Sequence, residues 1–82
     1  MSTVSHQIPP QHFVILSSPL MERPAAFWSG PGGTLETAEQ TTFTTFGPDQ
    51  IYDFHPAAVE AGIPEDEIMR VLDESVKEQA DV

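Results

Sequence analysis

The chain has 82 residues, no cysteine, and a net charge of −10 from 13 acidic and 3 basic side chains. This length accommodates one small domain, and the lack of cysteine excludes disulfides and thiolate metal sites. The charge argues against direct binding to nucleic acid, where Lys and Arg must replace phosphate counterions, and against an anionic membrane surface.

The N-terminal residues 1–11 are polar and end in Pro9 and Pro10, which predicts a flexible tail before a single domain over residues 12–82. No basic stretch leads into an apolar one, so no signal peptide is predicted. No apolar run approaches the ~20 residues of a membrane span. The expected location is the cytoplasm.

Three segments have the β-branched and aromatic composition of strands. Residues 12–18 predict a central strand with both faces buried, residues 25–30 carry Phe27 and Trp28, and residues 41–46 are rich in Thr and Phe. The glycine-rich residues 29–33 predict a hairpin turn. The segment 34–40 fits a strand, a loop or a helical turn.

Phe43 and Phe46 are three residues apart, so they cannot both lie on one face of a regular strand. Either a bulge separates them or the strand ends before Phe46.

The last third of the chain predicts two helices. Residues 55–62 place Pro56 in a first turn and Gly62 just past the end, as helix termini favour. Residues 64–80 begin with carboxylates, which suit a helix N-terminus, and continue with an apolar stripe.

The sequence therefore predicts an α+β fold: a small antiparallel sheet of about three strands packed by the C-terminal helix, with a short helix before it. The expected core is Phe13, Ile15, Phe27, Phe43, Ile68, Val71, Leu72 and Val76.

Residues 57–72 resemble the helix-turn-helix of bacterial repressors through Ala58, Gly62, Ile63, Ile68 and Val71, because a small residue and a glycine permit a tight helical corner. The exposed positions of the second helix are acidic, whereas a recognition helix presents basic or amide side chains. One alternative function is therefore a protein-binding adaptor or phage structural subunit, with contacts through Ile63 and Met69.

Residues 53–82 carry nine acidic side chains against Arg70 and Lys77. A surface of one sign suits a basic partner, although a solvated face that maintains solubility stays open as an interpretation. Trp28 and Tyr52 have polar tips that suit a partly exposed contact. The predicted partner-binding residues are Glu60, Glu65, Asp66, Glu67, Asp73, Glu74 and Glu78, with Trp28 and Tyr52.

No catalytic signature is present. Residues 30–34 lack the lysine and helix of a phosphate loop, no nucleophile has an evident base, and the three histidines are not spaced for zinc. No enzymatic activity, metal or cofactor is predicted.

The segment Phe27-Trp28-Ser29-Gly30, followed by Gly33-Thr34-Leu35-Glu36 and Thr42-Phe43-Thr44, is similar to small proteins of phages and mobile elements. With its size and acidity, the chain resembles anti-CRISPR and other anti-defence inhibitors. The resemblance implies a stoichiometric inhibitor in a bacterial host cell that occupies the nucleic-acid-binding groove of a basic target, such as a CRISPR–Cas complex. It assigns no role to a particular residue.

Overall fold

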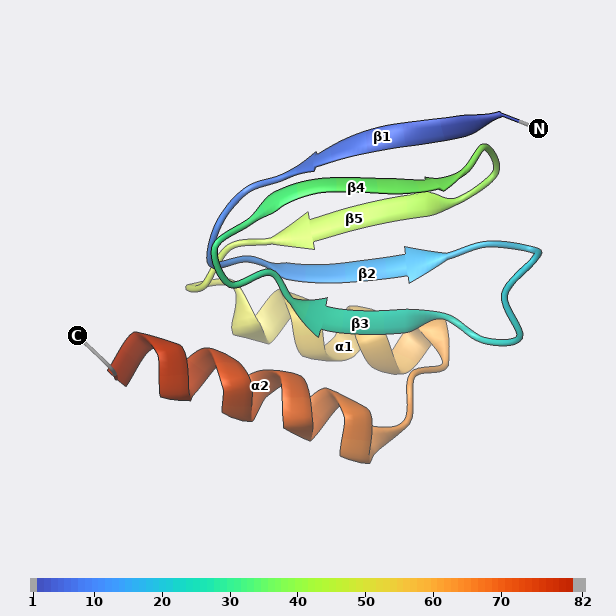
Figure 1. Cartoon of the computed structure of the whole chain (residues 1–82). Helices are drawn as coiled ribbons and strands as arrows, with labels where there is room; N and C mark the ends of the chain where they lie inside the picture. The colour runs from blue at the N-terminus through green and yellow to red at the C-terminus, as the bar shows by residue number, and fades with distance from the viewer. Residues whose placement is uncertain (1, 81–82) are drawn as a thin grey trace.

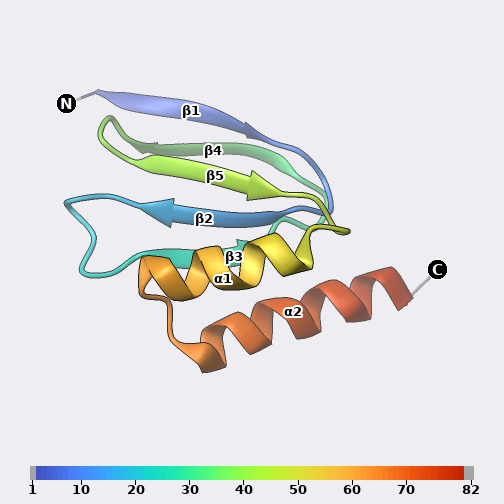
Figure 2. The same cartoon turned by 180° about the vertical axis from the view of Figure 1, so that it is seen from behind.

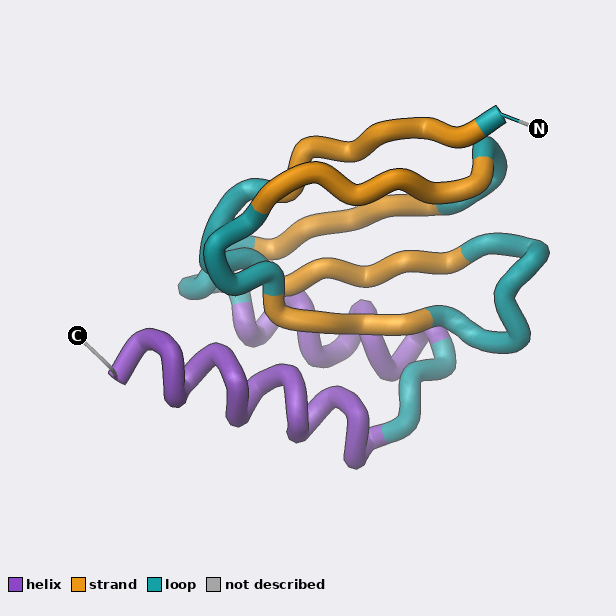
Figure 3. Tube along the Cα trace, viewed as in Figure 1, coloured by secondary structure: helices purple, strands orange, loops and turns teal. Residues whose placement is uncertain are grey.

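Five strands and two helices make up residues 2–80, the part of the chain that this computed structural model describes (Figures 1 and 3). The predicted α+β class, with a C-terminal helix, is confirmed. The elements are β1 (Thr3–Ile8), β2 (Phe13–Ser17), β3 (Ala25–Trp28), β4 (Gly33–Ala38), β5 (Thr42–Phe46), α1 (Ile51–Ala61) and α2 (Glu65–Ala80).

The three predicted strands form one antiparallel sheet in the order β3-β2-β5. Phe13 of the central strand β2 lies opposite Trp28 on one side and Phe46 on the other. Phe13, Val14 and Ile15 are all buried. Because successive side chains of a strand point to opposite faces, this burial means that both faces of the sheet are covered.

The helices cover one face of this sheet, and β1 with β4 covers the other (Figures 1 and 2). On the helical face, Phe13 stacks on Phe54 of α1 with ring centroids 4.5 Å apart. On the opposite face, Phe43 of β5 stacks on His6 of β1 at 4.6 Å. The molecule therefore has three layers: a two-stranded ribbon, a three-stranded sheet and a helix pair.

This layering explains the spacing of Phe43 and Phe46. Strand β5 pairs regularly with β2 through both residues, so neither a bulge nor an early strand end is needed. Phe46 contacts Phe54 on the helical face, with centroids 5.9 Å apart, while Phe43 points toward β1. The odd spacing places the two half-buried rings on opposite faces of β5, where each packs against a different layer.

Residues 3–8, predicted as part of a flexible tail, form strand β1 antiparallel to β4. Thr3 lies opposite Ala38 and Ile8 opposite Gly33. The segment left open between strand and loop is thus a strand over 33–38. The tail prediction is wrong because the polar residues of β1 conceal an alternation: Ile8 is buried and His6 is half-buried between exposed neighbours.

The glycine-rich turn does not close a hairpin, since β3 and β4 belong to different sheets. It connects β3 in the three-stranded sheet to β4 in the two-stranded ribbon, and hydrogen bonds join it to the segment that follows β1. The Gln11 N–H donates to the Gly30 carbonyl at 2.8 Å, and the Ser29 hydroxyl donates to the Pro9 carbonyl at 2.8 Å. A Cβ at Gly32, where φ is +79°, would lie 2.6 Å from the Ile8 carbonyl oxygen.

Helix α1 begins at Ile51, four residues earlier than predicted, and Pro56 lies inside it. Ile51, Phe54 and Ala58 form its packed stripe, and this stripe outweighs the hydrogen bond that Pro56 cannot donate. Gly62 has φ +98° and ends the helix. The Gly62 N–H donates to the Val59 carbonyl and the Ile63 N–H donates to the Ala58 carbonyl. These two bonds are the pattern of a Schellman motif.

The core differs from its prediction in several positions. Phe13, Ile15, Ile68 and Val71 are buried as predicted. Phe27, Phe43 and Leu72 are half-buried, and Val76 is 58% exposed, so its assignment to the core is wrong. The packed side of α2 is centred on Ile68, Val71 and Ser75, which turns Val76 to solvent. The buried apolar residues absent from the predicted core are Ile8, Val14, Ala26, Trp28, Phe54, Ala58 and Ile63.

Candidate protein-binding surface

Helix α2 holds most of the acidic side chains that the sequence selects as partner contacts. Glu65, Asp66 and Glu67 lie in its first turn and Lys77 in its last, an arrangement that complements the helix dipole. The helix packs beside β3 and buries Ile68. Its carboxylates occupy most of the circumference outside the buried stripe of Ile68, Val71 and Ser75, so those next to the stripe face the fold and the others face solvent.

Glu78 belongs to the packed side of α2. Its Oε2 accepts a hydrogen bond from Nε1 of Trp28 on β3. Trp28 is 8% exposed and lies edge-on against Phe13, with ring centroids 4.9 Å apart. The prediction that Trp28 is a partly exposed contact is therefore wrong, and Glu78 serves the fold by pairing a buried indole N–H.

Glu67 also faces the fold. Its Oε1 lies 3.4 Å from Nη2 of Arg23 in the β2–β3 loop, and its side chain is 20% exposed. Its Oε2 is buried with no hydrogen-bond partner among residues 2–80. This enclosed carboxylate holds the loop against the first turn of α2, which corrects its prediction as a solvent-facing contact.

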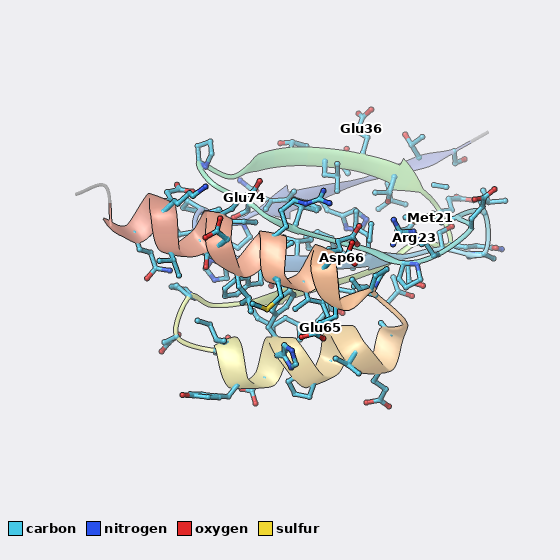
Figure 4. The ribbon with its side chains drawn as sticks, turned by 90° about the horizontal axis from the view of Figure 1, so that it is seen from below. Met21, Arg23, Glu36, Glu65, Asp66 and Glu74 are labelled. Atoms are coloured by element: carbon cyan, nitrogen blue, oxygen red, sulfur yellow. The ribbon has the colours of Figure 1, made fainter. Side chains whose placement is uncertain are left out.

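The remaining predicted acidic residues are exposed. Glu65 Oε1 lies 3.3 Å from His55 Nε2, and Asp73 Oδ2 lies 3.2 Å from Lys77 Nζ. Within the described part of the chain, Glu60, Asp66 and Glu74 have no ion pair. Figure 4 shows Glu65 on the side of α2 that faces α1, and Asp66 and Glu74 farther round the same helix. The exposed set is Glu60, Glu65, Asp66, Asp73 and Glu74.

Two cations reduce the charge of this surface. Arg70 is exposed and is four residues from both Asp66 and Glu74, and exposed Lys77 pairs with Asp73. The exposed side of α2 therefore carries four carboxylates against two cations. This side is less acidic than the nine carboxylates against two cations of residues 53–82 indicate, because Glu67 and Glu78 face the fold and Asp53 and Glu60 belong to α1.

Large apolar side chains are exposed on the same two helices. Tyr52 is 92% exposed, Val59 51%, Met69 55% and Val76 58%. The sequence selected Tyr52 and Met69 but not the two valines, although the spacing of seven residues within each helix marks both pairs. Ile63, the other residue chosen for an adaptor function, is 5% exposed and belongs to the core, which corrects that choice.

Other parts of the described chain offer little chemistry. Among residues 2–80, no three His, Asp or Glu side chains are grouped to hold a metal ion. An open pocket is lined by Ser2, Leu20, Ala38, Glu39 and Gln40, of which only Glu39 is ionisable, so it holds no acid–base pair.

Neither described helix combines the length and the apolar composition that crossing a membrane requires. No family model, curated protein or solved structure matches this chain.

Proposed function

We propose that this protein is a stoichiometric inhibitor that binds a basic nucleic-acid-binding protein and excludes its DNA or RNA. The observation that carries the proposal is the set of exposed carboxylates Glu60, Asp66 and Glu74, which have no ion pair within residues 2–80. A carboxylate gains little from an exposed contact, but several meeting a Lys/Arg-lined groove speed association and select the partner.

The proposed target class is a phage-defence complex, such as a CRISPR–Cas effector, in a bacterial host cell. This part rests on the resemblance of residues 27–44 to small phage and mobile-element proteins. The charge supports it, because the groove of such an effector is built to hold a polyanion, and a chain of net charge −10 competes for the same Lys and Arg side chains.

The test is a charge reversal restricted to residues that do not support the fold. Glu67 and Glu78 are excluded because they bond Arg23 and Trp28. The variant is Glu60→Lys, Asp66→Lys and Glu74→Lys together. The matched control reverses three exposed carboxylates outside the helices, Glu22→Lys, Glu36→Lys and Glu39→Lys, and therefore has the same net charge.

The measurement is displacement of labelled duplex DNA from purified phage-defence effector complexes, followed by fluorescence anisotropy. The parent protein should release DNA from at least one complex at equimolar concentration and lose potency as salt rises. The helix variant should be inactive and the control active. Failure of the parent on every complex would reject the target class, and equal potency of the two variants would reject the helical surface.

An adaptor that binds protein without displacing nucleic acid is the second candidate, and the exposure of Met69 favours it. The two functions differ in salt response. Electrostatic exclusion weakens with added salt, whereas a mainly apolar contact does not.

A further inference from the structure

Each helix carries an exposed apolar pair separated by seven residues. On α1 the pair is Tyr52 and Val59, and on α2 it is Met69 and Val76. Seven residues are almost two helical turns, so the members of a pair lie on one stripe, about 10 Å apart along the axis. All four side chains are more than half exposed.

The side chains of α1 and α2 meet at a contact between His55 and Glu65. His55 follows Tyr52 by three residues and precedes Val59 by four, so it shares their stripe. Glu65 precedes Met69 by four residues. Since His55 Nε2 and Glu65 Oε1 are 3.3 Å apart, the stripes border the same contact. We name the surface formed by Tyr52, His55, Val59, Glu65, Met69 and Val76 the helix seam.

The seam is continuous with the core beneath it. Ile51 of α1 and Leu72 of α2 are half-buried and pack against the core cluster. Both belong to the side of their helix that carries the seam, because Ile51 precedes His55 by four residues and Leu72 precedes Val76 by four. The seam is thus an apolar surface supported from below by the packed helices.

Acidic side chains border the seam on α2. Met69 has Glu65 four residues before it, Asp66 three before it and Asp73 four after it, all exposed. Glu65 contacts His55 and Asp73 pairs with Lys77. The three carboxylates still outnumber the two exposed cations of α2, Arg70 and Lys77. Residues at these separations are neighbours on a helix surface. An apolar centre with an acidic border is complementary to a helix that has an apolar stripe flanked by Lys or Arg.

We infer that the helix seam is the docking site for one basic amphipathic helix of the target protein. The inference rests on the proposed function for the basic character of that partner. The apolar stripe of the docked helix covers Tyr52, Val59, Met69 and Val76, while its flanking cations face the acidic border. A second copy of this chain is the poorer occupant, because two chains of net charge −10 would bring their acidic borders together.

The first experiment maps binding on the full chain with a synthetic peptide of about 18 residues, or five helical turns. The peptide places Leu on one face and Lys on the other, and a control peptide carries Glu in place of Lys. Titration of the ¹⁵N-labelled protein should shift amide resonances near Met69, Val76 and Val59 with the Lys peptide only. Equal shifts around Glu36 and Glu39 on the opposite layer would show unspecific charge attraction and overturn the inference.

The second experiment removes the apolar contact without changing charge. Met69→Gln with Val76→Gln should weaken binding of the Leu/Lys peptide at least tenfold in calorimetry. Both side chains are exposed, so the unfolding midpoint should be retained. The matched control, Leu20→Gln with Met21→Gln, alters an exposed apolar pair in the β2–β3 loop and should bind as the parent does.

The outcomes separate the inference from the proposed function. If the Met69/Val76 Gln variant displaces DNA from a target with the same potency as the parent, the helix seam is not the docking site and the inhibitory function stands. If the peptide binds the seam but no target loses DNA, the inhibitory function is wrong and the seam stands. A concentration-dependent dimer in sedimentation velocity that the Met69/Val76 variant abolishes would identify a second copy as the occupant and overturn the inference.

Discussion

Glu67 and Glu74 lie on the same helix, seven residues apart, and have different roles. Glu67 is enclosed against Arg23, while Glu74 is exposed. Residues seven apart lie on the same side of a helix, so residue type and spacing give no sign of this difference. The difference comes from the β2–β3 loop, which places Arg23 beside Glu67 in the first turn of α2. At this scale the sequence identifies candidate contacts but does not separate structural carboxylates from free ones.

Replacement of Glu78 by Ala should destabilise the protein by about 1–3 kcal/mol, because the buried Trp28 N–H loses its acceptor. Urea unfolding followed by far-ultraviolet circular dichroism measures the change. Glu74→Ala removes an exposed carboxylate from the same helix and should stay within about 0.5 kcal/mol of the parent. Equal effects of the two substitutions would contradict the structural role of Glu78.

Replacement of Gly32 by Ala should cost more stability than replacement of Gly62 by Ala. Both glycines have positive φ, +79° and +98°, a conformation that costs an L-residue about 1–2 kcal/mol. Only at Gly32 does the added Cβ also meet backbone atoms, the Ile8 oxygen at 2.6 Å and the Pro10 nitrogen at 2.9 Å. The difference between the unfolding free energies of the two variants measures the cost of the close backbone approach at Gly32. A difference near zero would contradict that close approach.

Among the elements, α2 and the three strands of the central sheet follow from the sequence. Their apolar periodicity is strong, and β2 in particular is a short apolar run between polar flanks. Strand β1 and the first turn of α1 do not follow. β1 has one buried residue, Ile8, so its pairing depends on β4, far along the chain. In α1, Pro56 led to a predicted helix start that is too late. The helix includes this exposed proline because Phe54 and Ala58, on either side of it, are buried in the core.

Removal of residues 1–8 distinguishes a strand from a tail. The truncation removes strand β1, which pairs with β4, and with it the buried Ile8 side chain and the His6 ring that stacks on Phe43. The unfolding free energy should fall by more than about 2 kcal/mol, since burying one Ile side chain contributes about 1.5–3 kcal/mol. Residues 1–8 would have to be a tail if the truncated protein unfolded at the same urea concentration as the parent.

For the molecule as a whole, the net charge is visible in the sequence but its distribution is not. Arg70 and Lys77 lie among the exposed carboxylates of α2, and Arg23 faces Glu67. Likewise, the helix seam arises only when α1 and α2 are placed side by side, which brings Glu65 to His55. A site that one helix carries alone is readable from periodicity, whereas a site shared by two helices needs their packing.

A net charge of −10 should make thermal stability depend on salt. Raising the ionic strength from about 0.01 M to about 1 M shortens the Debye length from ~30 Å to ~3 Å and screens the self-repulsion of the folded chain. Scanning calorimetry should show a higher Tm at high salt. The increase should be smaller for the variant Glu22→Gln, Glu36→Gln and Glu39→Gln, whose altered side chains are exposed, and an equal increase would argue against self-repulsion.

The contact between Trp28 and Glu78 gives the molecule its own fluorescent reporter. Trp28 is the single tryptophan of the chain, its indole is buried, and its hydrogen-bond acceptor lies 50 residues away near the end of α2. The emission of one fluorophore therefore senses whether the last turns of α2 are seated on β3. A partner that draws this helix away from the sheet would shift the emission toward that of a hydrated indole, whereas one that covers only the outer helix surface would leave it unchanged.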